Sequence, residues 1–154
     1  MNNSRNFRNA LGRYPTGVAI VGAYVDGEAL GMTINSFASV SLEPPLVLWS
    51  IETNSERRSI FETAPFYSIS ILAHDQSNLA HACAQDADFN ACEIRWDGDR
   101  APLVHDAVAT FLCKPFAAYP GGDHEILVGE VVEMATPRDV AALEFYRGNY
   151  GVAG

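Results

Sequence analysis

The sequence is poor in cations, poor in cysteine and free of long apolar runs. Ten Lys and Arg residues stand against 19 Asp and Glu residues among 154, so the formal net charge is −9. A surface of this sign disfavours nucleic acid as a partner, and any bound anion has to be held by local cations and backbone N–H groups. No apolar run approaches the roughly 20 residues of a membrane-spanning helix, so no membrane partner is expected.

The three cysteines exclude two common kinds of site. Cys83, Cys92 and Cys113 are odd in number and contain no C-x-x-C pair, which argues against a disulfide framework and against a zinc knuckle. The sequence also has no H-E-x-x-H motif, no dinucleotide-binding G-x-G-x-x-G and no P-loop, so no metal site and no Rossmann or P-loop site is expected. The polar N-terminus has no signal-peptide core, which predicts a cytoplasmic protein.

Apolar runs separated by short turns predict a mainly β protein with helical additions. Strands are expected over 16–25, 28–34, 46–51, 66–72, 107–118 and 125–134. Helical spacing or capping residues predict helices over 5–13, 54–63, 76–83 and 137–143. The acidic segment 86–99 is expected to be an irregular, packed excursion. Because β-α-β alternation is absent, we expect a small antiparallel barrel forming one domain over 1–154.

A dense group of small polar side chains lies between two predicted strands. Thr33, Asn35, Ser36 and Ser39 fall within this group, and Thr33 and Asn35 face the same side of an extended chain. Hydroxyl and amide groups in such a wall can hydrogen-bond the polar edge of a flat heterocycle. The alternative is a polar turn that satisfies its own backbone groups.

Two further groups could contact a ligand. Ser55, Arg57 and Arg58 stand at a predicted helix start, where N–H groups and guanidinium side chains can bind phosphate; the alternative is a capped surface helix. Asp123 and His124 follow two glycines, so His124 could hydrogen-bond a ligand while Asp123 orients it; the alternative is an ordinary hairpin. A hydrolase triad using both is not favoured, since no G-x-S-x-G elbow is present and neighbouring residues of an extended strand point apart.

In their order along the chain, five segments resemble the short-chain flavin reductase family, the reductase components of two-component flavin-dependent monooxygenases. One of them is the run Ser-x-Ser-Leu-x-Pro-Pro-Leu that begins at Ser39. The five segments are 14–19, 31–37, 39–47, 122–124 and 146–150. The resemblance implies a split antiparallel β-barrel that binds flavin, usually as a homodimer. It also implies oxidation of NADH or NADPH, reduction of FMN or FAD, and delivery of reduced flavin to a partner monooxygenase.

The same resemblance implies roles for individual residues. The flavin would be lined by Thr33, Asn35, Ser36, Ser39 and the backbone near Ser50. Ser55 and Arg58 would bind its phosphate, and His124 with Asp123 would lie beside the nicotinamide. Where the family most often has Ser or Thr, this chain has Asn35. The aromatic tail Phe145, Tyr146 and Tyr150 could close over a neighbouring subunit of the dimer or pack on its own barrel.

Two other functions compete with the reductase. A flavin carrier or sensor would share the polar wall but would not need His124. A split-barrel oxidase acting on pyridoxamine phosphate would need more basic residues for the substrate phosphate than this acidic chain has. Hydride transfer between nicotinamide and flavin needs no protein nucleophile or metal, which agrees with the absence of such motifs.

Overall fold

The computed structural model describes residues 3–85 and 94–154, so Cys92 and most of the acidic segment predicted over 86–99 lie outside the described residues. The helices are α1 Ser4–Leu11, α2 Arg58–Thr63 and α3 Ser77–Gln85. The strands are β1 Thr16–Gly17, β2 Ala19–Val25, β3 Glu28–Ile34, β4 Ala38–Leu42, β5 Pro45–Glu52, β6 Tyr67–Ile71, β7 Trp96–Asp97, β8 Leu103–Val104, β9 Ala109–Gly121, β10 His124–Ala135, β11 Leu143–Tyr146 and β12 Asn149–Val152.

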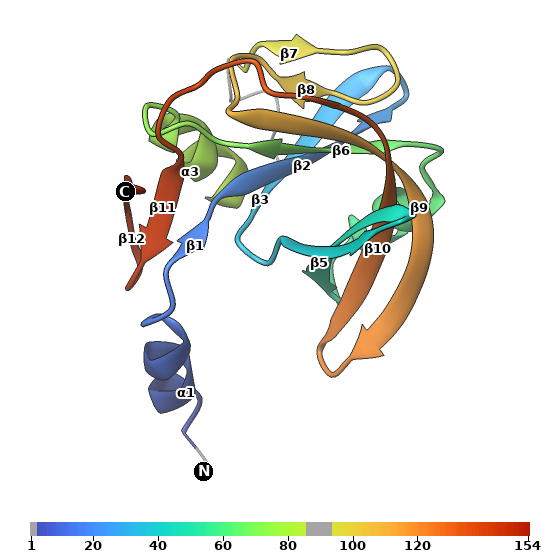
Figure 1. Ribbon diagram of the computed structural model, residues 1–154. Coiled ribbons are helices and arrows are strands. Elements are labelled where there is room, and N and C mark those ends of the chain that lie inside the picture. The colour runs from blue at the N-terminus through green and yellow to red at the C-terminus, as the bar shows by residue number, and fades with distance from the viewer. Residues whose placement is uncertain (1–2, 86–93) are drawn as a thin grey trace.

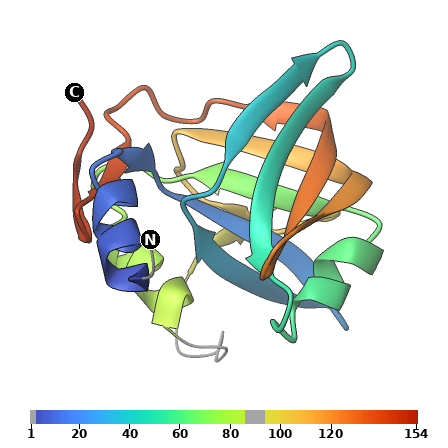
Figure 2. The same cartoon turned by 90° about the horizontal axis from the view of Figure 1, so that it is seen from below.

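Seven antiparallel strands form the main sheet in the order β3-β2-β6-β9-β10-β5-β4. The sheet curls strongly, and β3 and β4 at its two edges are joined by only three residues, 35–37 (Figures 1 and 2). β1, β11 and β12 form a second, small sheet, and β7 pairs with β8. The prediction of a mainly β, antiparallel barrel architecture with helical additions is confirmed.

Two apolar clusters lie on opposite faces of the curled sheet. The inner cluster is centred on three aromatic rings packed edge to face, Trp49, Phe61 and Tyr67, with centroids 5.0–6.2 Å apart. The second cluster, which includes Ile20 and Leu72, packs under α3 and the C-terminal strands. Burial of these large side chains is the main stabilising contribution to the fold.

Gly31, which precedes the group of polar residues, is a glycine because of how β3 packs. A side-chain Cβ at this position would lie 2.8 Å from Cη2 of Trp96, the first residue of β7. Real Cβ atoms do not approach other atoms so closely, so the glycine lets the indole cover β3 directly. This places Trp96, and with it the start of the segment that carries β7 and β8, against β3.

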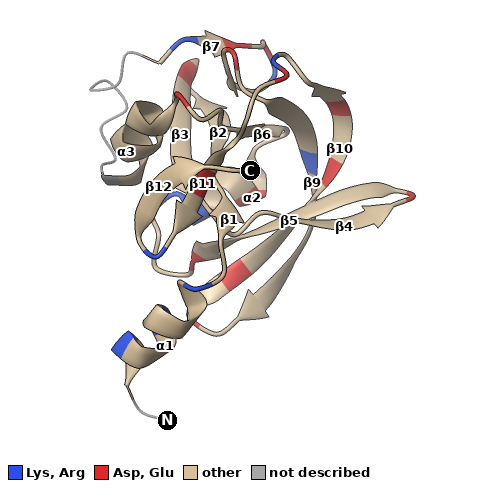
Figure 3. Ribbon diagram, turned by 60° about the vertical axis from the view of Figure 1, so that its left-hand side comes forward, with Lys and Arg blue, Asp and Glu red and all other residues tan. Residues whose placement is uncertain are grey.

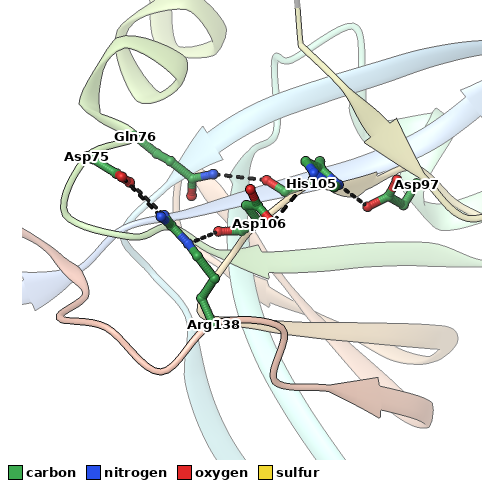
Figure 4. A network of polar contacts seen from close by, with 6 residues as sticks. All are labelled: Asp75, Gln76, Asp97, His105, Asp106 and Arg138. Carbon is green, nitrogen blue, oxygen red and sulfur yellow. Dashed lines mark hydrogen bonds and ion pairs between the residues drawn. The ribbon is translucent and has the colours of Figure 1, made fainter.

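A polar network fastens the segment between β10 and β11 to the body of the protein (Figure 4). Arg138 donates two hydrogen bonds to the Asp75 carboxylate, at 3.0 and 2.6 Å, and a third to the backbone oxygen of Asp106 at 2.8 Å. Next to it, His105 Nδ1 lies 2.9 Å from the Asp97 carboxylate, and Gln76 donates to the His105 carbonyl. The predicted helix over 137–143 is therefore wrong: this stretch is extended, and Leu143 opens β11.

The first helix contacts little of the remaining structure. The Asn3 side chain caps α1 by accepting a hydrogen bond from the Arg5 N–H at 2.9 Å, and no residue of the helix is buried. Figure 1 shows α1 standing away from the sheet. Its large apolar side chains, Phe7 and Leu11, are 50% and 57% exposed. Within the part of the chain that the structure describes, no helix is long and apolar enough to cross a membrane.

Candidate functional site

A cavity of about 350 Å³ opens where the ends of β3, β5 and β10 meet. It brings together six of the nine residues predicted for the site: Thr33, Asn35, Ser36, Ser50, Ser55 and His124. The remaining lining residues are Met32, Ile34, Ile51, Glu52 and Ala84. We call this space the main cavity. Its volume lies in the range of small-molecule sites, and its walls mix apolar and uncharged polar groups with one acidic residue, Glu52.

Ser36 joins the connection after β3 to the strand β5. Its Oγ accepts a hydrogen bond from the Ser50 N–H at 3.0 Å and donates to the Ser50 carbonyl at 3.4 Å. The hydroxyl hydrogen and the neighbouring backbone N–H are thus already used inside the protein. Ser36 therefore shapes the wall, and only the remaining lone pairs at this position can meet a ligand.

Thr33 and Asn35 both line the main cavity, as their spacing predicts. The Thr33 hydroxyl donates to the Ala80 carbonyl of α3 at 2.8 Å, which ties β3 to that helix. Asn35 is exposed, and its amide makes no hydrogen bond with any residue that the structure describes. The Asn35 amide is thus a wall group with both donors and an acceptor available to a ligand.

Asp123 and His124 form a hydrogen-bonded pair at the start of β10. Asp123 Oδ1 lies 2.7 Å from His124 Nδ1, and hydrogen bonding to His124, followed by its charge, lowers the pKa of Asp123. Since an ionised carboxylate can only accept, Nδ1 carries the hydrogen and Nε2 is left for other partners. The two side chains would point apart only in an extended chain, and Asp123 lies in the turn before β10 rather than in the strand.

Thr53 holds this turn against the end of β5. The Thr53 N–H and hydroxyl both donate to the Asp123 carbonyl, at 3.0 and 2.9 Å. The first residue of β10 consequently pairs with Glu52, the last residue of β5. This register is what brings His124 to the main cavity opposite the polar residues that follow β3.

The predicted phosphate residues are arranged differently from the expectation. Helix α2 begins at Arg58 rather than at Asn54 or Ser55, and the Ser55 hydroxyl accepts from the Arg57 N–H at 3.2 Å in the turn before it. Ser55 lines the main cavity. Arg58 does not, and its guanidinium lies 3.6 Å from the Glu62 carboxylate and 3.4 Å from that of Glu125.

Ser39 is also placed elsewhere. It lies on β4, is exposed, and pairs with Val47 of β5 rather than lining the main cavity. The polar run thus divides into two parts. Its first half forms the cavity wall. Its second half forms β4, a strand that the sequence pattern does not predict.

Sequence reasoning missed a side cavity of about 190 Å³ that adjoins the main cavity. The two cavities share Thr33, Ile34, Asn35 and Ala84, and the side cavity adds the rings of Phe145 and Tyr150. These rings pack on their own chain: the Tyr150 ring meets the His81 ring edge-on at 4.7 Å and the Phe145 ring at 5.5 Å. Phe145 and Tyr150 thus pack on their own chain, whereas Tyr146 is 38% exposed, and closure of the aromatic tail over a neighbouring subunit stays a prediction.

No group of three or more potential metal ligands occurs within 3–85 and 94–154. Within the same residues no serine hydroxyl hydrogen-bonds His124, so the Asp123–His124 pair has no third member of a triad. The main cavity thus offers orientation and hydrogen bonding to a ligand rather than a nucleophile.

Comparison with known proteins places this architecture in a family. The family model described as "Flavin reductase like domain" matches residues 11–154, and the chain belongs to this family. It is 42% identical over 150 residues to the FMN reductase (NADH) SmoA of Agrobacterium fabrum, covering 97% of this chain and 86% of that protein. The resemblance found in the sequence is confirmed.

Two further proteins are similar over nearly their whole length. The reductase component of 4-hydroxyphenylacetate 3-monooxygenase from Thermus thermophilus is 33% identical over 145 residues, covering 94% of this chain and 93% of that protein. The solved structure of the NADH:FAD oxidoreductase SgcE6 from Streptomyces globisporus C-1027, in complex with NAD and FAD fragments, superposes with a TM-score of 0.91 at 32% identity. It covers 97% of this chain and 92% of that one.

Proposed function

We propose that this chain is an NAD(P)H-dependent flavin reductase that reduces FMN or FAD and releases the reduced flavin to a partner monooxygenase. The observation that carries the proposal is the main cavity, with Thr33, Asn35 and Ser36 on one wall and His124 at the facing strand end. The flavin reductases to which the chain is similar support the same reaction.

The wall residues suit the ring of a flavin. Ser36 and Thr33 are fixed by their hydrogen bonds to Ser50 and Ala80, so the wall is preorganised before a ligand arrives. The Asn35 amide offers donors and an acceptor to the polar edge of the ring, while Met32 and Ile51 supply apolar surface. When bound, flavin and nicotinamide supply the hydride chemistry, and the protein positions them and excludes water.

His124 is proposed to orient the hydride donor. With Nδ1–H directed to Asp123, the neutral imidazole presents Nε2 as an acceptor for the amide hydrogens of a nicotinamide carboxamide. Asp123 is a positioning residue, since its carboxylate fixes the ring and the tautomer. Ser55 and Arg58 are proposed to bind the flavin phosphate, which would compete with Glu62 and Glu125 for the Arg58 guanidinium.

The test compares His124→Ala with wild type in NADH oxidation with added FMN or FAD. Losing one hydrogen bond between neutral groups, worth about 1 kcal/mol, predicts a fall of about fivefold in turnover, with flavin affinity changed less than about twofold. His74→Ala is the matched control, because His74 is exposed and does not line the main cavity.

Each outcome bears on a different part of the proposal. Unchanged turnover in His124→Ala would remove His124 from the mechanism. Flavin binding by the wild type without NADH or NADPH oxidation would contradict the reductase and favour the flavin carrier or sensor.

A homodimer, a partner monooxygenase, a cytoplasmic location and a single domain over 1–154 complete the proposal. The dimer is supported by apolar side chains that are exposed in one chain, among them Phe7 and Leu11 on α1 and Leu42, 95% exposed, at the end of β4. Similarity to a reductase component of a two-component monooxygenase supports the oxygenase partner. A molar mass in solution equal to one chain would contradict the dimer.

A further inference from the structure

The cations of this acidic protein are distributed unevenly. Arg58, Arg100 and Arg138 form ion pairs with carboxylates, and Lys114 lies over the Phe66 ring. Arg8, Arg13 and Arg147 line one hollow of about 600 Å³, and none of the three forms an ion pair with a carboxylate in the described part of the chain. The Arg147 guanidinium lies 5.3 Å from the centroid of the Tyr146 ring. We call this hollow the arginine pocket. Figure 3 shows basic residues on α1 and at the turn between β11 and β12.

The pocket is built by backbone contacts between the two ends of the chain. Arg8 lies in the last turn of α1, and Gly12 ends the helix. The Arg147 N–H donates to the Gly12 carbonyl at 3.0 Å, which holds the β11–β12 turn against the helix end. The two turn residues, Arg147 and Gly148, have φ of 50° and 79°, a combination suited to a tight two-residue hairpin.

The arginine pocket and the side cavity have one lining residue in common. Phe145 lines both the arginine pocket and the side cavity. The side cavity in turn shares Thr33 and Asn35 with the main cavity. A ligand whose ring occupies the main cavity could therefore extend past Tyr150 and Phe145 to the three guanidinium groups.

The charge of the pocket selects for phosphate. A net charge of −9 repels anions at long range, so three arginines without carboxylate partners form a local exception. A guanidinium group can donate two parallel hydrogen bonds to phosphate oxygens, and a diphosphate presents enough oxygens for all three arginines. The Phe145 ring adds an apolar surface on which a purine can rest.

We propose that the arginine pocket binds the adenosine diphosphate moiety of a dinucleotide whose reactive ring lies in the main cavity. The proposal rests on the proposed function. NADH and FAD both contain this moiety, whereas FMN and reduced nicotinamide mononucleotide lack it, so the two sources can be separated by experiment.

The first experiment measures binding of ADP itself to the purified protein by calorimetry. We expect ADP to bind wild type and to bind at least about tenfold more weakly to Arg147→Asn, since one charged hydrogen-bonding group is lost. Asparagine is chosen because it tolerates the left-handed backbone of this turn. Arg8→Gln and Arg13→Gln, which leave the turn intact, should weaken ADP binding in the same direction.

Arg95→Ala is the charge-matched control, because Arg95 is exposed and does not line the arginine pocket. It should bind ADP like wild type. Adenosine, which lacks the phosphates, should bind all variants alike. Equal ADP affinity in wild type and in all three pocket variants, or no ADP binding to wild type, would overturn the proposal.

The second experiment identifies the source and separates this proposal from the proposed function. A rise of KM in Arg147→Asn for NADH but not for reduced nicotinamide mononucleotide would place the hydride donor in the pocket. A rise for FAD but not for FMN would place the FAD diphosphate in the pocket, and would then contradict the proposed binding of the flavin phosphate by Ser55 and Arg58. Unchanged KM values for all four would overturn the proposal. Turnover of FMN with the mononucleotide donor tests the reductase alone, because neither compound carries adenosine diphosphate.

Discussion

Tyr67 carries a buried hydroxyl that allows a quantitative test of the barrel core. The side chain is 1% exposed, and its hydroxyl has no hydrogen-bond partner among the described residues. Burial raises the pKa of this hydroxyl. Two strands away in the sheet, a Cβ added at Gly129 of β10 would run into the Tyr67 hydroxyl, and would lie 2.9 Å from Tyr67 Cζ and 3.1 Å from Cys113 Cβ.

We therefore expect opposite effects from two single substitutions. Gly129→Ala should lower the free energy of unfolding by about 1 to 3 kcal/mol, the usual cost of overpacking a core. Tyr67→Phe should raise it by about 1 kcal/mol, since an unsatisfied buried polar group costs about 1 to 3 kcal/mol. In the Tyr67→Phe background the cost of Gly129→Ala should shrink by about 1 kcal/mol, with some cost remaining because Cζ is still close.

The assay is equilibrium unfolding in urea, followed by tryptophan fluorescence at one fixed protein concentration because oligomer stability depends on concentration. Gly17→Ala on β1 is the control: a Cβ there meets nothing within 4 Å, so its effect should stay within about 0.5 kcal/mol. If the two substitutions add to within about 0.5 kcal/mol, the proposed clash between position 129 and the hydroxyl is refuted.

Two further predictions concern pH. Hydrogen bonding with Glu125, followed by burial and by repulsion from the Glu125 charge, raises the pKa of Glu62. Ionisation of Glu62 therefore destabilises the fold, and stability is lost as the pH rises through this raised pKa. Glu62→Gln should be more stable than wild type at about pH 7 but not at about pH 4, and equal differences in melting temperature at both pH values would contradict this. Hydrogen bonding and charge from Arg138 lower the pKa of Asp75. The ionised Asp75 carboxylate therefore stabilises the fold above the unfolded pKa of Asp, and this stabilisation is lost as the pH falls through the lowered value. In Arg138→Ala, the Asp75 carboxyl signal followed by NMR should titrate at a higher pH than in wild type, and an unchanged midpoint would exclude this ion pair.

The sequence predicted most strands because their signals are local. Strands β2 and β3 lie where the apolar runs over 16–25 and 28–34 indicated, and β9 and β10 cover the strands predicted over 107–118 and 125–134, although β9 continues to Gly121. These elements combine apolar side chains with turn residues that permit few alternatives. Their family resemblance then supplied the topology, which periodicity alone does not contain.

The errors arise where tertiary contacts override local preference. Pro137 and the following alanines favour a helix over 137–143, but this stretch instead hydrogen-bonds to the end of β6 and to the residues after it. The Leu143 N–H donates to the Leu72 carbonyl, and the His74 N–H donates to the Ala141 carbonyl. Likewise, Ser55 looks like a helix cap but caps only a turn, because α2 starts three residues later. Propensity is a weak guide wherever a sheet edge offers partners.

The candidate site was only partly predictable for a related reason. Thr33, Asn35 and Ser36 are neighbours in sequence, so their common wall could be expected from residues alone. The approach of His124 to that wall depends on the β5–β10 register, and the arginine pocket depends on contact between the two ends of the chain. Neither long-range arrangement leaves a periodic signal in the sequence.

The hydrogen bonds within the wall indicate which residue distinguishes this protein's ligand contact. Ser36 and Thr33 donate their hydroxyl hydrogens to backbone carbonyls, so they fix the shape of the cavity but have no hydrogen left to offer a ligand. The Asn35 amide keeps both donors and its acceptor. A hydroxyl at position 35 would offer one rotatable donor, whereas a planar amide offers a donor and an acceptor at fixed positions. We therefore expect the selectivity of the wall for one edge of a heterocycle to depend on Asn35 more than on the more numerous hydroxyl groups around it.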